Sequence, residues 1–157
     1  MIKGSENVSQ SQKMRTALKK LVIPNLLEKG FVGEYPHYKK TYDDRIELLS
    51  FDTNKWGNSF TVEISTVFLP SSKRDNNFSD SKNKDYNNAT VWDTNYRYRL
   101  RGMFDGWFSY DDEFYDKVCD EVNKQMEDAY KWWDLFYKNK RFKIKLMEFI
   151  DEKGLIK

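Results

Sequence analysis

The stretch that decides the fold is FTVEISTVF, residues 60–68. One face would carry Phe60, Val62, Ile64, Thr66 and Phe68, which alternate with the polar residues Thr61, Glu63 and Ser65. Because successive side chains of a strand point to opposite faces, this alternation predicts a strand with one buried face and one wetter face. Pro70 predicts the end of the strand, because proline cannot donate to a sheet ladder.

Three further segments on either side of this strand also favour β structure. Residues 35–42 and 46–51 are rich in aromatic and aliphatic side chains and flank Asp43 and Asp44, a turn signal, so they predict a hairpin. Residues 96–101 alternate tyrosine or leucine with arginine and predict a fourth strand. Four strands that follow one another along the chain favour an antiparallel meander.

Helical spacing dominates both ends of the chain. Apolar residues recur at three- and four-residue intervals from about residue 11, and Pro24 predicts a kink or a break in that helix. Gly30 followed by Phe31 predicts a Schellman-type end. A longer amphipathic helix is expected over residues 112–137, with this apolar stripe: Tyr115, Val118, Cys119, Val122, Met126, Ala129, Tyr130, Trp133, Phe136 and Tyr137.

The order of elements predicts an α+β fold, because strands grouped together argue against an alternating parallel α/β sheet. A shorter helix is expected over 142–150, capped by Gly154. Both C-terminal helices should cover one face of the four-stranded sheet, and the other face should stay partly open.

Length and composition indicate a single domain over 12–157 after a polar tail, 1–11. Aromatic residues make up 17% of the 157 residues and can supply the core, although 33% of the residues are charged. Segment 71–92 is dense in Ser, Asn, Asp and Lys and is too long for an ordinary hairpin loop. We expect a solvated insertion there, with a binding loop as the alternative.

The charge balance and the scarcity of certain residue types exclude several kinds of site. A net charge of +2 does not indicate a nucleic-acid or membrane partner. The absence of an apolar run or secretory leader in the sequence predicts a cytoplasmic protein. His37 is the only histidine and Cys119 the only cysteine, so the sequence has no multi-histidine or thiolate metal site. No cofactor-binding motif can be recognised either. We expect Cys119 to pack in the core and His37 to be an ordinary strand side chain.

The most specific surface feature is a row of three arginines on one face of the 96–101 strand, namely Arg97, Arg99 and Arg101. Residues two apart on a strand are about 6–7 Å apart, so an open row would present fixed cationic groups to an acidic partner. The alternative is that Glu63 and Asp52 neutralise the row or that a helix covers it. Trp132 lies off the apolar stripe of the long helix and is a second candidate contact residue, or else part of a second core layer.

Three stretches carry a resemblance to a known family: residues 23–31 with their Gly-Phe ending, residues 51–64 from Phe51-Asp52 through Trp56-Gly57, and Tyr98-Arg99-Leu100-Arg101-Gly102 followed by Trp107-Phe108. In these the chain resembles the bacterial domain of unknown function 4304 family, over about residues 12–138. The resemblance implies a fold and an order of elements, and no reaction. Some small α+β domains of this style resemble immunity proteins against toxins, which is an analogy of fold only.

These observations favour a non-catalytic protein-binding module, immunity- or adaptor-like, that uses an open sheet face and the 71–92 loop. Its partner would be another protein, such as a toxin. The first alternative is a nucleic-acid-binding domain that uses Arg97, Arg99 and Arg101 with aromatic stacking, which the charge balance disfavours. The second is a small hydrolase built on carboxylates such as Glu63 and Asp52, or a ligand pocket between sheet and helix.

Overall fold

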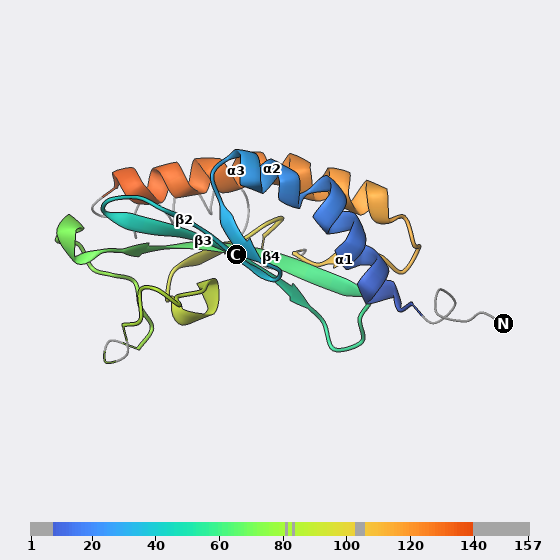
Figure 1. Ribbon diagram of the computed structural model, residues 1–157, viewed down its shortest axis with the longest axis horizontal. Helices are drawn as coiled ribbons and strands as arrows, with labels where there is room; N and C mark the ends of the chain where they lie inside the picture. Colours follow the sequence, from blue (N-terminus) through green and yellow to red (C-terminus); the bar gives the residue numbers. More distant parts are fainter. Residues whose placement is uncertain (1–7, 81, 83, 103–105, 140–157) are drawn as a thin grey trace.

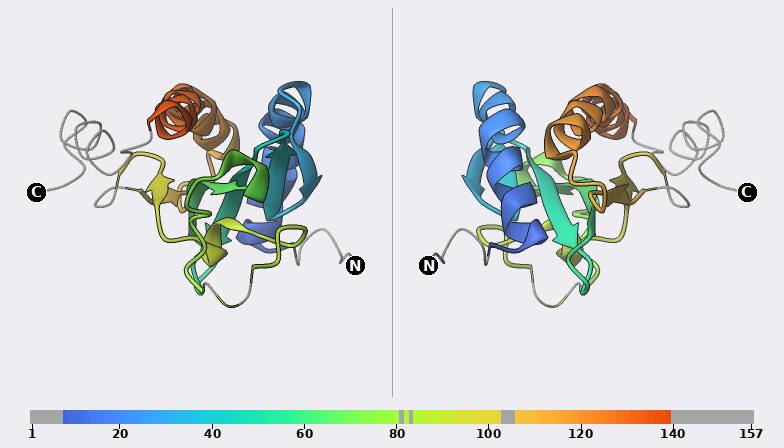
Figure 2. Two further views of the ribbon diagram at one scale, coloured as in Figure 1. Left: turned by 90° about the vertical axis from the view of Figure 1, so that its left-hand side faces the viewer. Right: turned by 90° about the vertical axis from the view of Figure 1, so that its right-hand side faces the viewer.

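The computed structural model describes residues 8–80, 82, 84–102 and 106–139. Three helices lie along one face of an antiparallel sheet, and a long connection crosses the opposite face (Figure 1). Figure 2 shows the same two-sided arrangement from the ends of the sheet. We call the two sides the helix face and the outer face. The α+β class is therefore confirmed.

The first helical region is broken at Pro24, as its sequence predicts. Helix α1 (Gln10–Leu21) starts with a capping box at Ser9, and α2 (Ile23–Glu28) carries Pro24 in its first turn. Helix α2 ends in a Schellman motif, because the Phe31 N–H donates to the Leu26 carbonyl while Gly30, at φ +99°, donates to Leu27.

The sheet holds six strands among the described residues, where the sequence predicted four. The strands are β1 (Val32–Glu34), β2 (His37–Thr41), β3 (Arg45–Thr53), β4 (Ser59–Phe68), β5 (Arg97–Arg99) and β6 (Phe108–Ser109). Strands β1 to β5 pair antiparallel in chain order, so the meander is confirmed, and β6 pairs with β4 beside β5. The two short strands, β1 and β6, were missed because three and two residues carry no readable alternation.

Helix α3 (Tyr115–Lys138) lies along the helix face and buries its apolar stripe. It begins later than predicted, because Glu113 has a left-handed backbone (φ +63°) and the chain turns there. The junction of α1 and α2 is fixed to α3 by Asn123, whose side-chain amide donates to the Leu21 carbonyl at 3.0 Å. The predicted helix at 142–150 lies outside the described residues.

The main core lies between the helices and the sheet. Val62 and Ile64 of β4 are fully buried there, together with Leu18 of α1 and Val122 of α3. This confirms the predicted inward face of β4.

The outer face is not open along its whole length, which corrects the prediction for segment 71–92. That segment, called the excursion below, packs on the outer face instead of extending into solvent (Figure 1). A second apolar cluster forms at this interface from Ile46, Leu48, Val67, Phe78, Ala89 and Val91. The few apolar residues of the excursion are enough to form this cluster, because it covers only part of one sheet face.

Candidate functional site

The part of the outer face that the excursion leaves uncovered carries a row of polar side chains across four strands. The strand register sets His37 opposite Ser50, Ser50 opposite Glu63, and Glu63 opposite Arg99. All four point to the same side, because paired residues in a sheet share a face. We call these four residues the polar row.

Glu63 is the electrostatic centre of this row. Its carboxylate accepts hydrogen bonds from Arg99 Nε at 3.0 Å and Nη2 at 2.9 Å, and from Arg97 Nη1 at 3.3 Å. The Glu63 side chain is 13% exposed, whereas the Arg97 side chain is 37% exposed. One carboxylate therefore neutralises two guanidinium groups only in part, and the ion triad keeps a net positive charge.

His37 and Ser50 form the other half of the polar row. His37 Nδ1 lies 2.7 Å from Ser50 Oγ, and the Trp92 ring meets the imidazole edge-on with centroids 4.6 Å apart. Burial lowers the pKa of His37 below its usual value, although the nearby Asp93 carboxylate opposes this. The imidazole is therefore neutral at pH 7 and exchanges a hydrogen bond with the hydroxyl.

Two half-exposed tryptophans flank the polar row. Trp92 stands beside His37 of β2 and is 43% exposed, while Trp107 lies against Arg99 of β5 and is 41% exposed. β2 and β5 are three strand spacings, or roughly 14 Å, apart in the sheet. The uncovered patch thus has an aromatic ring at each end and charged groups between them.

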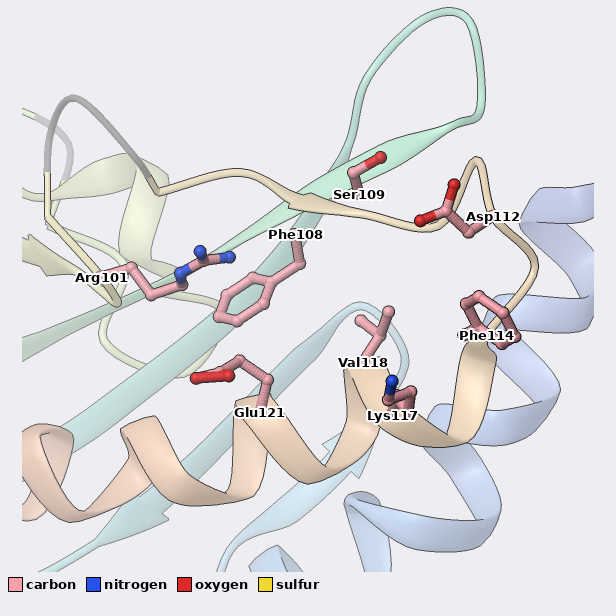
Figure 3. A pocket seen from close by; sticks show the side chains of 8 residues that line it. All are labelled: Arg101, Phe108, Ser109, Asp112, Phe114, Lys117, Val118 and Glu121. Carbon is pink, nitrogen blue, oxygen red and sulfur yellow. The ribbon is translucent and has the colours of Figure 1, made fainter.

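Arg101 does not belong to this patch, which corrects the predicted three-arginine row. Strand β5 ends at Arg99, and Arg101 has a left-handed backbone (φ +67°) that turns its side chain away. Figure 3 shows Arg101 beside Phe108, on the wall of a separate pocket of about 210 Å³ over the first turns of α3. Only Arg97 and Arg99 share the outer face.

Trp132 and Asp52 also depart from the predicted surface. Trp132 is fully buried and stacks on Phe136 at 4.6 Å and on Tyr98 at 6.3 Å, so it is a core residue. Its flank of α3 meets β5, which helical periodicity alone does not reveal. Asp52 is exposed on the outer face beside the polar row, and among the described residues it forms no salt bridge with Arg97 or Arg99.

The protein-family model described as "Domain of unknown function (DUF4304)" matches residues 22–135, well over half of the chain. The chain belongs to this family. No curated protein and no solved structure gives a significant match.

The DUF4304 region contains the whole polar row and both flanking tryptophans. It also includes the Gly30-Phe31 ending of α2 that carried the resemblance. The candidate site therefore lies within the family domain and not in an appended segment.

The chemistry available on the outer face of this DUF4304 domain is limited by burial. The contact between His37 and Ser50 has the length of a nucleophile–base pair, but Ser50 is only 1% exposed and presents no accessible hydroxyl. Cys119 is also buried, and burial raises the pKa of its thiol to about 12, which agrees with the predicted core role.

The part of the chain that the structure describes lacks a cluster of metal-ligating side chains and a membrane-spanning helix. Within it, no group of three or more His, Cys, Asp or Glu side chains is arranged to hold a metal ion. None of its helices combines the length and the apolar character needed to cross a membrane.

The sequence analysis does not identify Trp92, Trp107 and Ser50 as site residues, and it treats His37 as an ordinary strand side chain. The hairpin turn at Asp43-Asp44 could have aligned β2 with β3 and placed His37 beside Ser50. The two tryptophans gave no such signal, because their exposure depends on how the excursion and the loop before β6 fold back.

Proposed function

We propose that this protein is a non-catalytic protein-binding module, adaptor- or immunity-like, whose contact surface consists of Arg97, Trp92 and Trp107 with the partly exposed members of the polar row, His37, Glu63 and Arg99. The observation that carries the proposal is the pair of half-exposed tryptophans beside a partly neutralised arginine pair. Tryptophan and arginine are the residue types that most often dominate binding energy at protein interfaces.

The exposed rings supply the apolar part of such a contact. Trp92 and Trp107 each have one side held by a neighbour, His37 or Arg99, while the rest remains in contact with solvent. A ring that is already oriented loses little conformational freedom on binding, so burying the remainder is favourable.

Arg97 supplies the charged part and indicates the chemistry of the partner. Its Nη1 group bonds Glu63, and among the described residues no other side chain pairs with this 37% exposed guanidinium, whose further N–H groups can donate. A guanidinium pairs best with a carboxylate in a two-bond geometry. We therefore infer an acidic protein partner that places a carboxylate on Arg97 between the two tryptophans.

The nucleic-acid alternative has less support than this proposal. It relied on three adjacent arginines, whereas Arg101 lies elsewhere and Glu63 is shared by Arg97 and Arg99. A net charge of +2 offers little of the phosphate attraction on which such binding depends.

The test is affinity capture from cells that carry the natural gene, with the wild-type protein and matched variants as bait. The open-face variants are Arg97→Glu, Trp92→Ala and Trp107→Ala. Their controls are Lys13→Glu, on exposed α1, and Trp56→Ala, in the turn between β3 and β4, where Trp56 is 74% exposed. All five variants change exposed side chains, so each should fold.

The proposal expects at least one protein to be captured by the wild type and both controls and lost with all three open-face variants. A single hot-spot change should weaken its binding roughly 30-fold or more. Equal capture by all variants, or loss with the controls alone, would contradict the proposal.

A further inference from the structure

A second concave site lies on the helix face, on the other side of the sheet from the polar row. It is a pocket of about 210 Å³, which we call the helix-side pocket. Its walls come from the end of α2, from β2 and β3, and from the last turns of α3. Ligand sites for drug-sized molecules occupy roughly 300–1,000 Å³, so any occupant here is small.

Half of the residues that line the pocket are aromatic, and their rings contact its cations. Lys29 Nζ lies over the Tyr130 ring at 5.2 Å, and Lys40 Nζ lies over the Tyr42 ring at 5.1 Å. The Arg45 guanidinium is sandwiched between Tyr42 and Tyr137, at 3.7 Å from each ring centroid. These contacts orient the cations without neutralising them.

Some of the charges around the pocket are already paired. Arg45 bonds Asp44 at 2.9 Å, and Asp134 pairs with Lys138 at 3.0 Å. Among the described residues, neither Lys29 nor Lys40 forms a salt bridge. Two ammonium groups therefore remain available at the pocket.

Glu47 and Asp134 are the two acidic residues that line the pocket, and Glu47 is the buried one, with only partly satisfied hydrogen bonding. It is 7% exposed, and its carboxylate accepts one long hydrogen bond, from the Tyr42 hydroxyl at 3.3 Å. The Arg45 Nε group lies 3.7 Å away, beyond hydrogen-bond length, and is itself buried without a hydrogen-bond partner. Burial raises the pKa of Glu47, although Arg45, Tyr42 and Lys40 oppose this shift.

Lys40 and Glu47 stand directly opposite each other on β2 and β3, yet they form no salt bridge. The Lys40 side chain instead runs over Gly30, where an added Cβ would lie 3.1 Å from Lys40 Cε. Cross-strand partners have Cβ atoms about 5 Å apart, so opposite charges at such positions normally pair. Lys40 and Glu47 thus line the same pocket without a direct ion pair between them.

We propose that the helix-side pocket binds a small zwitterion of the α-amino-acid class, with its ammonium group on Glu47 and its carboxylate between Lys29 and Lys40. A simple anion would meet the Glu47 carboxylate, and a simple cation would meet two ammonium groups. An α-amino acid carries an ammonium and a carboxylate group on one carbon atom, so it can pair with Glu47 and with the lysines at once. The aromatic wall also favours its ammonium group.

The test is isothermal titration calorimetry of the full chain with defined probes at up to about 10 mM, which detects weak affinities. The probes are L-leucine and L-phenylalanine, then N-acetyl-L-phenylalanine, which lacks the ammonium group, L-phenylalaninamide, which lacks the carboxylate, and inorganic phosphate. At least one of the two amino acids should bind, and removal of either charge should weaken binding roughly ten- to hundredfold.

Variants assign each charge to a side chain. Glu47→Gln should lower the affinity for the amino acid by about the same factor as acetylation of the amino acid does. The affinity for the acetylated probe should not fall further in that variant. In Lys40→Met and Lys29→Met, affinity for the free amino acid should fall by about the same factor as amidation causes. Affinity for L-phenylalaninamide should not fall further in these variants. Lys131→Met, at an exposed position of α3 that does not line the pocket, should leave affinity unchanged.

This comparison of probe and variant distinguishes a ligand contact from a folding defect, because a misfolded variant would lose every probe alike. Absence of any amino-acid binding at the highest concentration would overturn the proposal. Equal affinity for phosphate or for the singly charged probes would overturn it too, as would full affinity in Glu47→Gln. None of these results depends on the protein-binding surface, because the two sites lie on opposite faces of the sheet.

Discussion

The side-chain amide of Asn77 bonds both backbone groups of Tyr96. Its Oδ1 accepts from the Tyr96 N–H at 2.9 Å, and its Nδ2 donates to the Tyr96 carbonyl at 3.1 Å. The same Nδ2 also donates to the Thr66 carbonyl of β4 at 2.9 Å. One buried side chain thus connects the start of the excursion, its end and the sheet, and so fixes the boundary of the uncovered outer face.

Asn77→Ala should destabilise the protein by about 2–4 kcal/mol, because it leaves several buried backbone groups without partners. The expected fall in Tm is roughly 6–12 °C in a thermal unfolding experiment. Asn77→Gly should cost about 1 kcal/mol less, since glycine accepts the φ of +74° at this position. Asn88→Ala, at an exposed position of the excursion, is the control and should stay within about 0.5 kcal/mol. Equal Tm values for Asn77→Ala and the control would contradict the anchoring role.

Arg74 attaches the excursion to the end of α3. Its guanidinium donates to the carbonyls of Phe136, Tyr137 and Asn139 and lies 3.8 Å from the Phe68 ring centroid. A cation there satisfies terminal carbonyls and complements the helix dipole. Arg74→Met should therefore cost about 1–3 kcal/mol in urea unfolding, whereas Arg74→Lys should retain part of that energy. A Met variant as stable as the wild type would exclude this capping role.

His37 should make stability fall as the pH is lowered through the range just below 6.5. Burial lowers the pKa of His37 in the folded protein below 6.5, its value in the unfolded chain, so the unfolded chain binds the proton first. The stability gained from the neutral imidazole is complete above pH 6.5 and is lost as the pH falls through the folded-state pKa. Since His37 is the only histidine, its NMR titration is unambiguous. A measured pKa above 6.5 would contradict the prediction, and His37→Gln should remove this part of the pH dependence.

Cys119 should be unreactive toward thiol reagents in the folded protein. Its side chain is fully buried, and burial raises the pKa of the thiol to about 12, so almost no thiolate is present at pH 7–8. Labelling followed by mass spectrometry should show modification only where urea unfolds the chain. Rapid labelling without denaturant would place Cys119 outside the core.

The elements that were predicted correctly are those with local signals. The alternation in β4 shows which face is buried, Pro24 breaks the first helical region, and Gly30 ends α2. Each of these depends on the period of a pattern or on backbone restrictions of one residue. Such signals do not require knowledge of what packs against them.

The candidate site was predicted less well because it depends on tertiary contacts. Ser65 lies on the wetter face of β4 by its pattern, yet the excursion buries it completely. Arg101 left the predicted arginine row through one backbone angle, and Trp132 is buried because α3 passes over Tyr98. The pairing of Glu63 with Arg97 and Arg99 is the alternative to an open row that the alternation of both strands allows, and it holds for Glu63 but not for Asp52.

The central claim, that the patch between Trp92 and Trp107 contacts an acidic partner protein, is tested most directly by site-specific photo-cross-linking. A benzophenone amino acid replaces Asp52, which is exposed on the outer face beside the polar row, or, as the control on the helix side, Leu27, which is 51% exposed. In cells that carry the natural gene, position 52 should cross-link to a protein at peptides rich in Asp and Glu, and Arg97→Glu should abolish the product. Cross-links that form from position 27 but not from position 52, or a product that persists with Arg97→Glu, would contradict the claim.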